Sequence, residues 1–191
     1  MKNALILHGA GNTSQGNWFP WLKKELEKEG YTVWSPDLPN SDEPNREDWL
    51  KTIFSNKEWQ FNENSIIIGH SAGATTILRI LEKLSEGKQI NKAILVGGVV
   101  ELGTEPAFFP YKRSMVEVPF DWEKIRRSAN EFYFIHSDND QYQCGADQGK
   151  IMQSHLGGQL IIKPGERHFN LENGEAYRKF PFLLHLILNK R

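Results

Sequence analysis

The sequence IIIGHSAG at residues 66–73 is the stretch that decides the fold of this 191-residue chain. Residues 66–68 form a fully apolar, β-branched run, which is typical of a strand buried on both faces of a parallel sheet. Apolar residues then recur at helical spacing over residues 74–84. The pattern between them is G-x-S-x-G, centred on Ser71, in the strand–turn–helix context of a nucleophile elbow.

This elbow predicts a chemical role for Ser71. A sharp turn projects its hydroxyl from the end of the sheet and places it at a helix N-terminus, where free N–H groups stabilise a developing oxyanion. Glycines at 69 and 73 avoid collisions with neighbouring elements. An ordinary tight turn is the alternative, but the strand before and the amphipathic helix after it favour the elbow. We therefore predict that Ser71 is a nucleophile.

Strand-like and helix-like segments alternate along the rest of the chain. Apolar or β-branched runs predict further strands at residues 4–7, 31–34, 93–96, 132–135 and 160–162. Helical spacing predicts further helices around residues 18–26, 49–54 and 175–188. About six βα units in series predict an α/β fold with a mostly parallel, doubly wound sheet and helices on both faces. Ligands bind such sheets beyond the carboxyl ends of the strands.

Size and composition limit the class of protein. The length suits one domain over residues 1–191, and a net charge of −1 without a basic stripe argues against nucleic-acid binding. A single cysteine, Cys144, allows no internal disulfide and fits a reducing compartment. The apolar run at residues 4–7 is shorter than a signal-peptide core, and the run at 180–188 is too short to span a membrane. We expect a cytoplasmic protein with no membrane partner.

The base that activates Ser71 is expected late in the chain, because this fold orders its catalytic residues as Ser, then Asp or Glu, then His. Five of the six histidines are unsuitable by position, since they precede or flank the elbow, lie before the acid loop or fall in helical stretches: His8, His70, His136, His155 and His185. His168 lies in a loop directly after the last predicted strand. We predict that His168 is the general base.

The acid is expected after the preceding strand, where the sequence offers Asp138 and Asp140. The loop must curl back for a carboxylate to reach Nδ1 of His168, which favours Asp140 over Asp138. Such a carboxylate holds the imidazole tautomer and stabilises the imidazolium. Either aspartate would otherwise be a turn residue that bonds its own backbone.

The oxyanion hole requires two N–H donors. One is expected from Ala72, the residue after the nucleophile, and the other from the loop after the first strand. We assign the second donor to Ala10, with Gly11 as the alternate. Small residues in that loop, Gly9 and Gly11 among them, let the backbone approach a substrate closely. We assign Gly9, Gly11 and the elbow residue His70 to substrate contacts.

Residues 97–122 show no clear period and carry several prolines and aromatic residues. They are either a small lid that lines an apolar acyl pocket or a cover that packs on the sheet. On the lid interpretation we assign Phe109 to the acyl pocket. No H-E-x-x-H pattern or paired Cys/His spacing is present, so we expect no metal and no cofactor.

The chain resembles the small α/β-hydrolases that include YdeN-like bacterial proteins and the retinoblastoma-binding serine hydrolase. The segments that carry the resemblance span nearly the whole chain: residues 8–9, 18–22, 36–39, 49–50, 69–73, 137–140 and 168–169. It implies a compact α/β-hydrolase fold with a minimal lid, esterase-like activity on small acyl substrates and, in some relatives, a role through protein binding. It also implies that the second acid of the loop, Asp140, is the triad member.

Two departures from that family leave the triad intact. Arg167 precedes the base where the family often has glycine, and residues 141–143 are Gln-Tyr-Gln where a proline and an apolar residue often follow the acid.

The expected function is hydrolysis of small carboxylic esters by Ser71, Asp140 and His168 through an acyl-enzyme. A peptidase or amidase with the same triad is one alternative, and a weakly active binding module for a protein partner is another. A nucleotide-binding domain is disfavoured, because Ser14 replaces the third glycine of a dinucleotide fingerprint and no P-loop lysine is present. Cys144 lacks an elbow and is disfavoured as a nucleophile.

Overall fold

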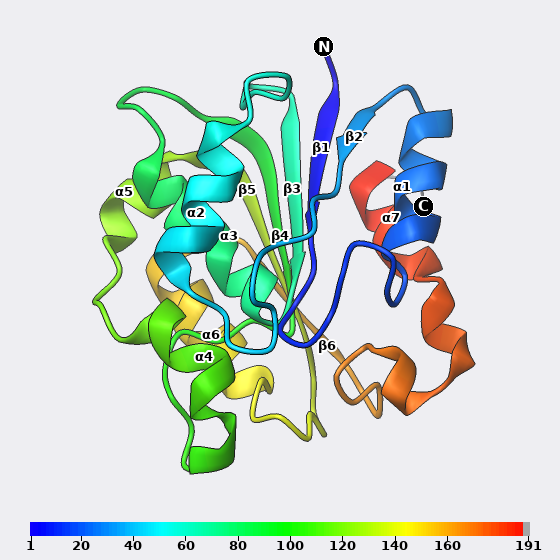
Figure 1. Cartoon of the computed structure of the whole chain (residues 1–191), viewed down its shortest axis with the longest axis vertical. Helices are drawn as coiled ribbons and strands as arrows, with labels where there is room; N and C mark the ends of the chain where they lie inside the picture. Colours follow the sequence, from blue (N-terminus) through cyan, green and yellow to red (C-terminus); the bar gives the residue numbers. More distant parts are fainter. Residues whose placement is uncertain (189–191) are drawn as a thin grey trace.

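The computed structural model, described here for residues 1–188, is built on one six-stranded sheet (Figure 1). All neighbouring strands are parallel, in the order β2-β1-β3-β4-β5-β6. The strands are β1 (Asn3–Leu7), β2 (Thr32–Trp34), β3 (Ser65–His70), β4 (Ile90–Val96), β5 (Ala129–Ser137) and β6 (Gln159–Lys163). The predicted parallel, doubly wound sheet is confirmed, and β3, which leads into the elbow, lies inside it.

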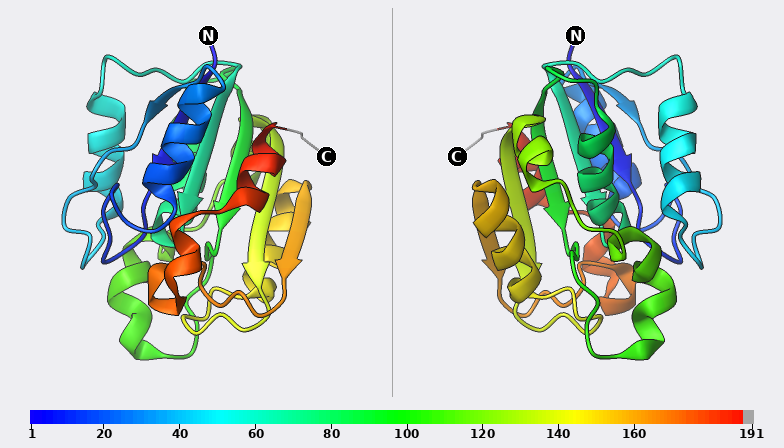
Figure 2. Two further views of the ribbon diagram at one scale, coloured as in Figure 1. Left: turned by 90° about the vertical axis from the view of Figure 1, so that its right-hand side faces the viewer. Right: turned by 90° about the vertical axis from the view of Figure 1, so that its left-hand side faces the viewer.

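Helices cover both faces of the sheet (Figures 1 and 2). Helices α1 and α7 pack on one face, and α2, α3, α5 and α6 pack on the other. The bounds are α1 (Phe19–Lys28), α2 (Arg46–Ser55), α3 (Ala72–Lys83), α4 (Phe109–Val116), α5 (Trp122–Arg127), α6 (Ala146–Leu156) and α7 (Pro181–Leu188). Helix α4 lies beyond the end of the sheet to which the strand arrows point (Figure 2).

Burial of the sheet on both faces explains the uninterrupted apolar runs in the sequence. In β1, Leu5 and Leu7 join the core under α2 and α3, whereas Ala4 and Ile6 join the core under α1. All four side chains are fully buried. Each fully buried leucine or isoleucine side chain contributes roughly 1.5–3 kcal/mol, so these runs hold both helical layers on the sheet.

The predicted closing helix over residues 175–188 is wrong in its first half. A short 3₁₀ helix covers Glu175–Arg178, Lys179 is extended with φ −138°, and α7 begins only at Pro181. A residue before proline avoids the helical region, and proline itself is favoured in the first turn of a helix. Pro181 therefore starts a new helix where the apolar spacing alone had predicted a continuous one.

The segment predicted as an irregular excursion after β4 contains regular structure. A 3₁₀ helix covers Pro106–Phe108 and leads into α4, and each has a proline in its first turn. These prolines begin helices, where the sequence analysis had treated them as signs of irregular chain. None of the helices within residues 1–188 has the length and apolar character needed to cross a membrane.

Candidate active site

Ser71 lies at the junction of β3 and α3 with a left-handed backbone, φ 55° and ψ −123°. Such a conformation costs on the order of 1–3 kcal/mol for a non-glycine residue, and tight packing holds it here. The Ser71 amide donates to the Val96 carbonyl of β4 at 2.8 Å. A Cβ on Gly69 would lie 2.4 Å from the Gly73 carbonyl oxygen, and one on Gly73 would lie 2.3 Å from that of His8. The elbow therefore requires both glycines.

Asp140 and His168 form a buried pair, with Nδ1 of His168 2.7 Å from Oδ2 of Asp140. The other carboxylate oxygen accepts the amides of Tyr142 at 2.8 Å and Cys144 at 3.4 Å. Burial opposes ionisation of Asp140, but the His168 contact and these amide bonds outweigh it and lower the pKa of the carboxyl group. The carboxylate thus keeps the proton of a neutral His168 on Nδ1 and leaves Nε2 as an acceptor.

Asp138 performs a different task from Asp140. Its Oδ1 accepts the amide of Gly165 at 2.8 Å, and the neighbouring Asn139 accepts the amide of Arg167 at the same distance. Both bonds tie the loop after β5 to the loop after β6. The geometry thus brings Asp140, and not Asp138, to the imidazole.

The three residues that the sequence analysis named as candidate oxyanion donors differ in what their amides already bind. The Gly11 amide donates to the Ser41 carbonyl at 2.8 Å, whereas the amides of Ala10 and Ala72 have no acceptor among residues 1–188. The alternate donor, Gly11, is therefore engaged in a loop contact. Gly9 packs against Ser71, since a Cβ there would lie 2.7 Å from Cβ of Ser71.

His8 fixes the peptide that carries the Ala10 amide. Its Nδ1 donates to the Gly9 carbonyl at 2.8 Å, and its Nε2 accepts the Leu38 amide at 2.8 Å. Burial lowers the pKa of His8, which favours the neutral ring that this pair of bonds requires. The Gly9 carbonyl and the Ala10 N–H belong to one planar peptide, so the histidine bond also sets the direction of the N–H.

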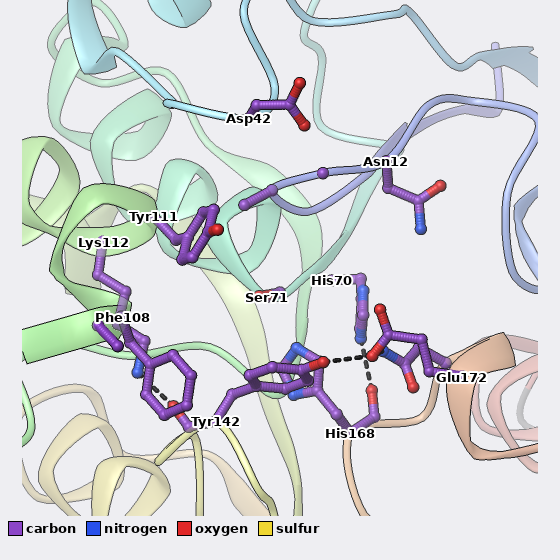
Figure 3. Close-up of a pocket in the computed structure, with 14 residues that line it drawn as sticks. Asn12, Asp42, His70, Ser71, Phe108, Tyr111, Lys112, Tyr142, His168 and Glu172 are labelled. Carbon is purple, nitrogen blue, oxygen red and sulfur yellow. Dashed lines mark hydrogen bonds between the residues drawn. The ribbon is translucent and has the colours of Figure 1, made fainter. Parts of the chain in front are cut away.

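Ser71 and His168 line the same cavity, which has a volume of about 420 Å³. Figure 3 shows Phe108, Tyr111 and Lys112 on the α4 side of Ser71, with Asn12 and Glu172 on the opposite side. The full lining is Ala10, Gly11, Asn12, Asp42, His70, Ser71, Ala107, Phe108, Tyr111, Lys112, Tyr142, His168, Asn170 and Glu172. One side of the cavity is therefore rich in aromatic rings and the other in polar groups.

Comparison with known proteins identifies the family. The serine hydrolase family model matches residues 4–187. The chain belongs to the serine hydrolase family. YdeN of Bacillus subtilis (strain 168) is 37% identical over 141 residues, which cover 73% of this chain and 72% of that protein. The serine hydrolase RBBP9 of Rattus norvegicus is 28% identical over 176 residues, which cover 90% of this chain and 88% of that protein.

Solved structures confirm the α/β-hydrolase fold. The crystal structure of the Bacillus subtilis YdeN product superposes with a TM-score of 0.89 and 28% identity, covering 99% of this chain and 98% of that one. Mouse α/β hydrolase domain-containing protein 10 superposes with a TM-score of 0.71 and 13% identity, covering 98% and 88%. The second likeness concerns the fold alone.

Phe109, which the sequence analysis assigned to the pocket of this serine hydrolase, does not line it. Helix α4 begins at Phe109 and turns that ring toward Arg113, whose guanidinium carbon lies 5.4 Å from the ring centroid. Phe108 and Tyr111 face the cavity instead. An irregular interpretation of this segment had no helical phase from which to choose between neighbouring aromatic residues.

Tyr142 is the main pocket residue that the sequence analysis did not assign. Its ring centroid lies 4.8 Å from that of His168 and 5.4 Å from that of Phe108. Its hydroxyl donates to Glu172, and its carbonyl accepts from Lys112 of α4. Burial and the neighbouring Glu172 carboxylate raise the pKa of Tyr142 to about 12. The departure from the family pattern at residues 141–143 was the only sequence signal for this role.

Asp140, Cys144 and His168 form one group whose potential ligand atoms lie within 4.8 Å of one another. Nδ1 of His168 and Oδ2 of Asp140 are already hydrogen-bonded to each other. Burial raises the pKa of the Cys144 thiol, which disfavours the thiolate that metals bind. This cluster is therefore a poor metal site, and the protonated thiol is a poor nucleophile.

Three histidines of this hydrolase make its stability depend on pH. Burial lowers the pKa values of His8, His70 and His136 in the folded protein, and the pKa of His70 falls to about 3. Histidine in an unfolded chain has a pKa near 6.5. The unfolded state therefore binds more protons below pH 6.5, and stability that is fully present above that pH is lost as the pH falls. We expect His70 alone to cost about 1.4 kcal/mol of unfolding free energy per pH unit between about pH 6 and pH 3.

Urea denaturation at a series of pH values measures this loss. The variant His70→Gln removes one protonation site and is expected to show a shallower slope, whereas His185→Gln, on an exposed position of α7, keeps the slope unchanged. A free energy of unfolding that stays flat from pH 7 to pH 4 would contradict the prediction.

Proposed function

We propose that this protein cleaves small carboxylic esters, with Ser71 as nucleophile, His168 as general base and acid, and Asp140 as the carboxylate that orients His168. The observation that carries the proposal is the 2.7 Å contact between His168 and Asp140 beside a cavity that Ser71 also lines. Membership of the serine hydrolase family supports it.

In the first half of the reaction, the Ser71 hydroxyl attacks the ester carbonyl carbon while Nε2 of His168 takes its proton. The amides of Ala10 and Ala72, which have no acceptor within residues 1–188, hold the resulting oxyanion. When the tetrahedral intermediate collapses, the carbon–oxygen bond to the alcohol breaks. The imidazolium then returns its proton to the alcohol oxygen, leaving an acyl group on Ser71.

In the second half, His168 takes a proton from water, whose oxygen attacks the acyl carbonyl. The bond to the Ser71 oxygen breaks, the serine recovers its proton from His168, and a carboxylic acid leaves. Asp140 remains ionised throughout and stabilises the imidazolium of each half. Two lowered barriers thus replace the single barrier of uncatalysed hydrolysis.

The size and lining of the cavity support small esters as substrates. A volume of about 420 Å³ lies near the lower end of the range for small-molecule sites. Phe108 and Tyr111 from the α4 side offer apolar contacts to an acyl group, and Tyr142 closes the wall beside His168. A short or aromatic acyl group suits this arrangement best.

A fluorophosphonate probe tests the proposed nucleophile directly. Because the probe reacts much faster with an activated serine than with an ordinary hydroxyl, we expect one adduct, on Ser71, located by intact mass and peptide mapping. Ser71→Ala and His168→Ala are expected to abolish labelling while circular dichroism shows both folded. Absence of an adduct on folded wild-type protein would reject the hydrolase mechanism and favour a binding module.

Substitution of the two aspartates separates their roles. Asp140→Asn removes the charge at His168 and favours the wrong tautomer, so we expect kcat to fall on the order of 10³- to 10⁴-fold. Asp138→Asn keeps an oxygen to accept the Gly165 amide and is its matched control, with a small effect. Ester hydrolysis followed by initial rates measures both. Equal losses, or a larger loss at Asp138, would reject the assignment.

Neighbouring phenylalanines test the acyl pocket. Phe108→Ala enlarges the aromatic side of the cavity, so we expect kcat/KM to shift toward longer acyl chains across a panel of p-nitrophenyl esters. Phe109→Ala, one residue on but outside the lining, is the control and is expected to leave the chain-length profile unchanged. A changed profile in Phe109→Ala alone would show that the acyl group binds elsewhere.

A further inference from the structure

Three histidines that take no part in the proposed reaction lie buried where strands β1, β3 and β5 end. His8 directly follows β1, His70 is the last residue of β3 and His136 is the penultimate residue of β5. Their exposed fractions are 1%, 3% and 0%. Burial lowers the pKa of each, so all three rings are neutral near pH 7. Each neutral ring has one N–H donor to place.

His70 directs its donor at the loop that carries the base. Its Nε2 lies 2.7 Å from the backbone carbonyl oxygen of His168 itself, and the two ring centroids are 4.7 Å apart. The indole N–H of Trp18 holds the next carbonyl, that of Phe169, at 3.1 Å. Two ring N–H groups therefore donate to consecutive carbonyls of the loop after β6 that carries His168, which we call the base loop. Figure 3 shows the hydrogen bond between His70 and His168.

That loop requires restraint, because its backbone is strained on both sides of the base. Arg167 has φ 49° and Phe169 has φ 54°, in the left-handed region that side chains other than glycine rarely adopt. A loop released from its hydrogen bonds would relax away from these angles and would carry the His168 imidazole with it. The His70 hydrogen bond also links this loop to the residue before Ser71, so it fixes the position of His168 relative to Ser71.

His136 acts on the acid loop in the same way, with the opposite ring nitrogen. Its Nδ1 lies 2.8 Å from the Cys144 carbonyl oxygen. The Cys144 amide in turn donates to Oδ1 of Asp140 at 3.4 Å. His136 therefore holds the far end of the turn that wraps around the Asp140 carboxylate.

A purely structural role does not explain why His70 and His136 are histidines, because one nitrogen of each ring has no partner. Nδ1 of His70 and Nε2 of His136 are buried and have no hydrogen-bond partner within the described part of the chain. A buried polar atom without a partner destabilises the fold, and an apolar ring of similar shape would avoid that cost. What the imidazole offers over such a ring is its single N–H bond to the loop.

We propose that His8, His70 and His136 are positioning residues, each of which fixes one loop of the catalytic machinery through a bond to a backbone carbonyl. His8 holds the oxyanion loop at Gly9, His70 holds the base loop at His168, and His136 holds the acid loop at Cys144. The inference rests on the proposed esterase mechanism. It adds a role for three residues that touch none of the reacting atoms.

His70 donates from Nε2 and His136 from Nδ1, so the same two amide substitutions are expected to have opposite effects at the two positions. A glutamine amide reaches about as far as Nε2 of histidine, and an asparagine amide about as far as Nδ1. His70→Gln and His136→Asn therefore keep the donor, whereas His70→Asn and His136→Gln misplace it, and His70→Phe and His136→Phe remove it. His185→Gln, exposed on α7, is the control outside these loops.

Steady-state hydrolysis of p-nitrophenyl acetate provides the main measurement. We expect the phenylalanine and misplaced-donor variants to lose kcat on the order of 10- to 100-fold with little change in KM, because the groups are displaced but the cavity remains. The two matched amides are expected to recover most of that kcat, and His185→Gln to equal wild type. Wild-type activity with no difference between matched and misplaced donors would overturn the inference while leaving the esterase proposal intact.

A second measurement needs no variant and no turnover. Nitrogen-15 NMR of the histidine rings in the wild-type protein is expected to show the Nε2–H tautomer for His70 and the Nδ1–H tautomer for His136 near pH 7. The opposite tautomer at either ring would overturn the inference, even if the variants fail to fold. Absence of ester hydrolysis and of probe labelling by the wild type would instead reject the underlying function.

Discussion

The close approach of the first loop to the elbow is the constraint on which the rest of the site depends. Gly73 lies so near the His8 carbonyl that even one added carbon would collide with it at 2.3 Å. This packing holds Ser71 in its left-handed conformation, with φ 55°. A wider separation of β1 and α3 would move Ser71 away from the loop that carries Ala10.

Around this junction, electrostatics separates one ionised group from several neutral ones. Amide and imidazole donors stabilise the Asp140 carboxylate enough to lower its pKa despite burial. Burial without a comparable counter-charge keeps His8, His70 and His136 neutral nearby. Neutral rings add no positive charge that would oppose an imidazolium on His168, and each has an N–H to give to a loop carbonyl.

The sequence predicts the sheet and the elbow well because both depend on local pattern. Fully apolar β-branched runs are typical of strands in a parallel sheet that is buried on both faces. A G-x-S-x-G pattern after such a run limits the turn to a nucleophile elbow for steric reasons. The sequence predictions fail where a proline begins a helix. Pro181 starts α7 inside a stretch predicted as one continuous helix, and Pro110 lies in the first turn of α4, inside a segment predicted as irregular, where Phe108 lines the cavity and Phe109 does not.

The sequence by itself determined the α/β class, the serine at the end of β3 and the chain order that singled out His168, because strand patterns and residue order are local properties. The sequence analysis favoured Asp140 over Asp138 and Ala10 over Gly11, but only the tertiary structure shows which aspartate contacts His168 and which amide has no acceptor among residues 1–188. Those choices depend on bonds between loops far apart in the chain. The Gly165 amide donates to Asp138, and the Ser41 carbonyl accepts the Gly11 amide. No local pattern of residues encodes either hydrogen bond.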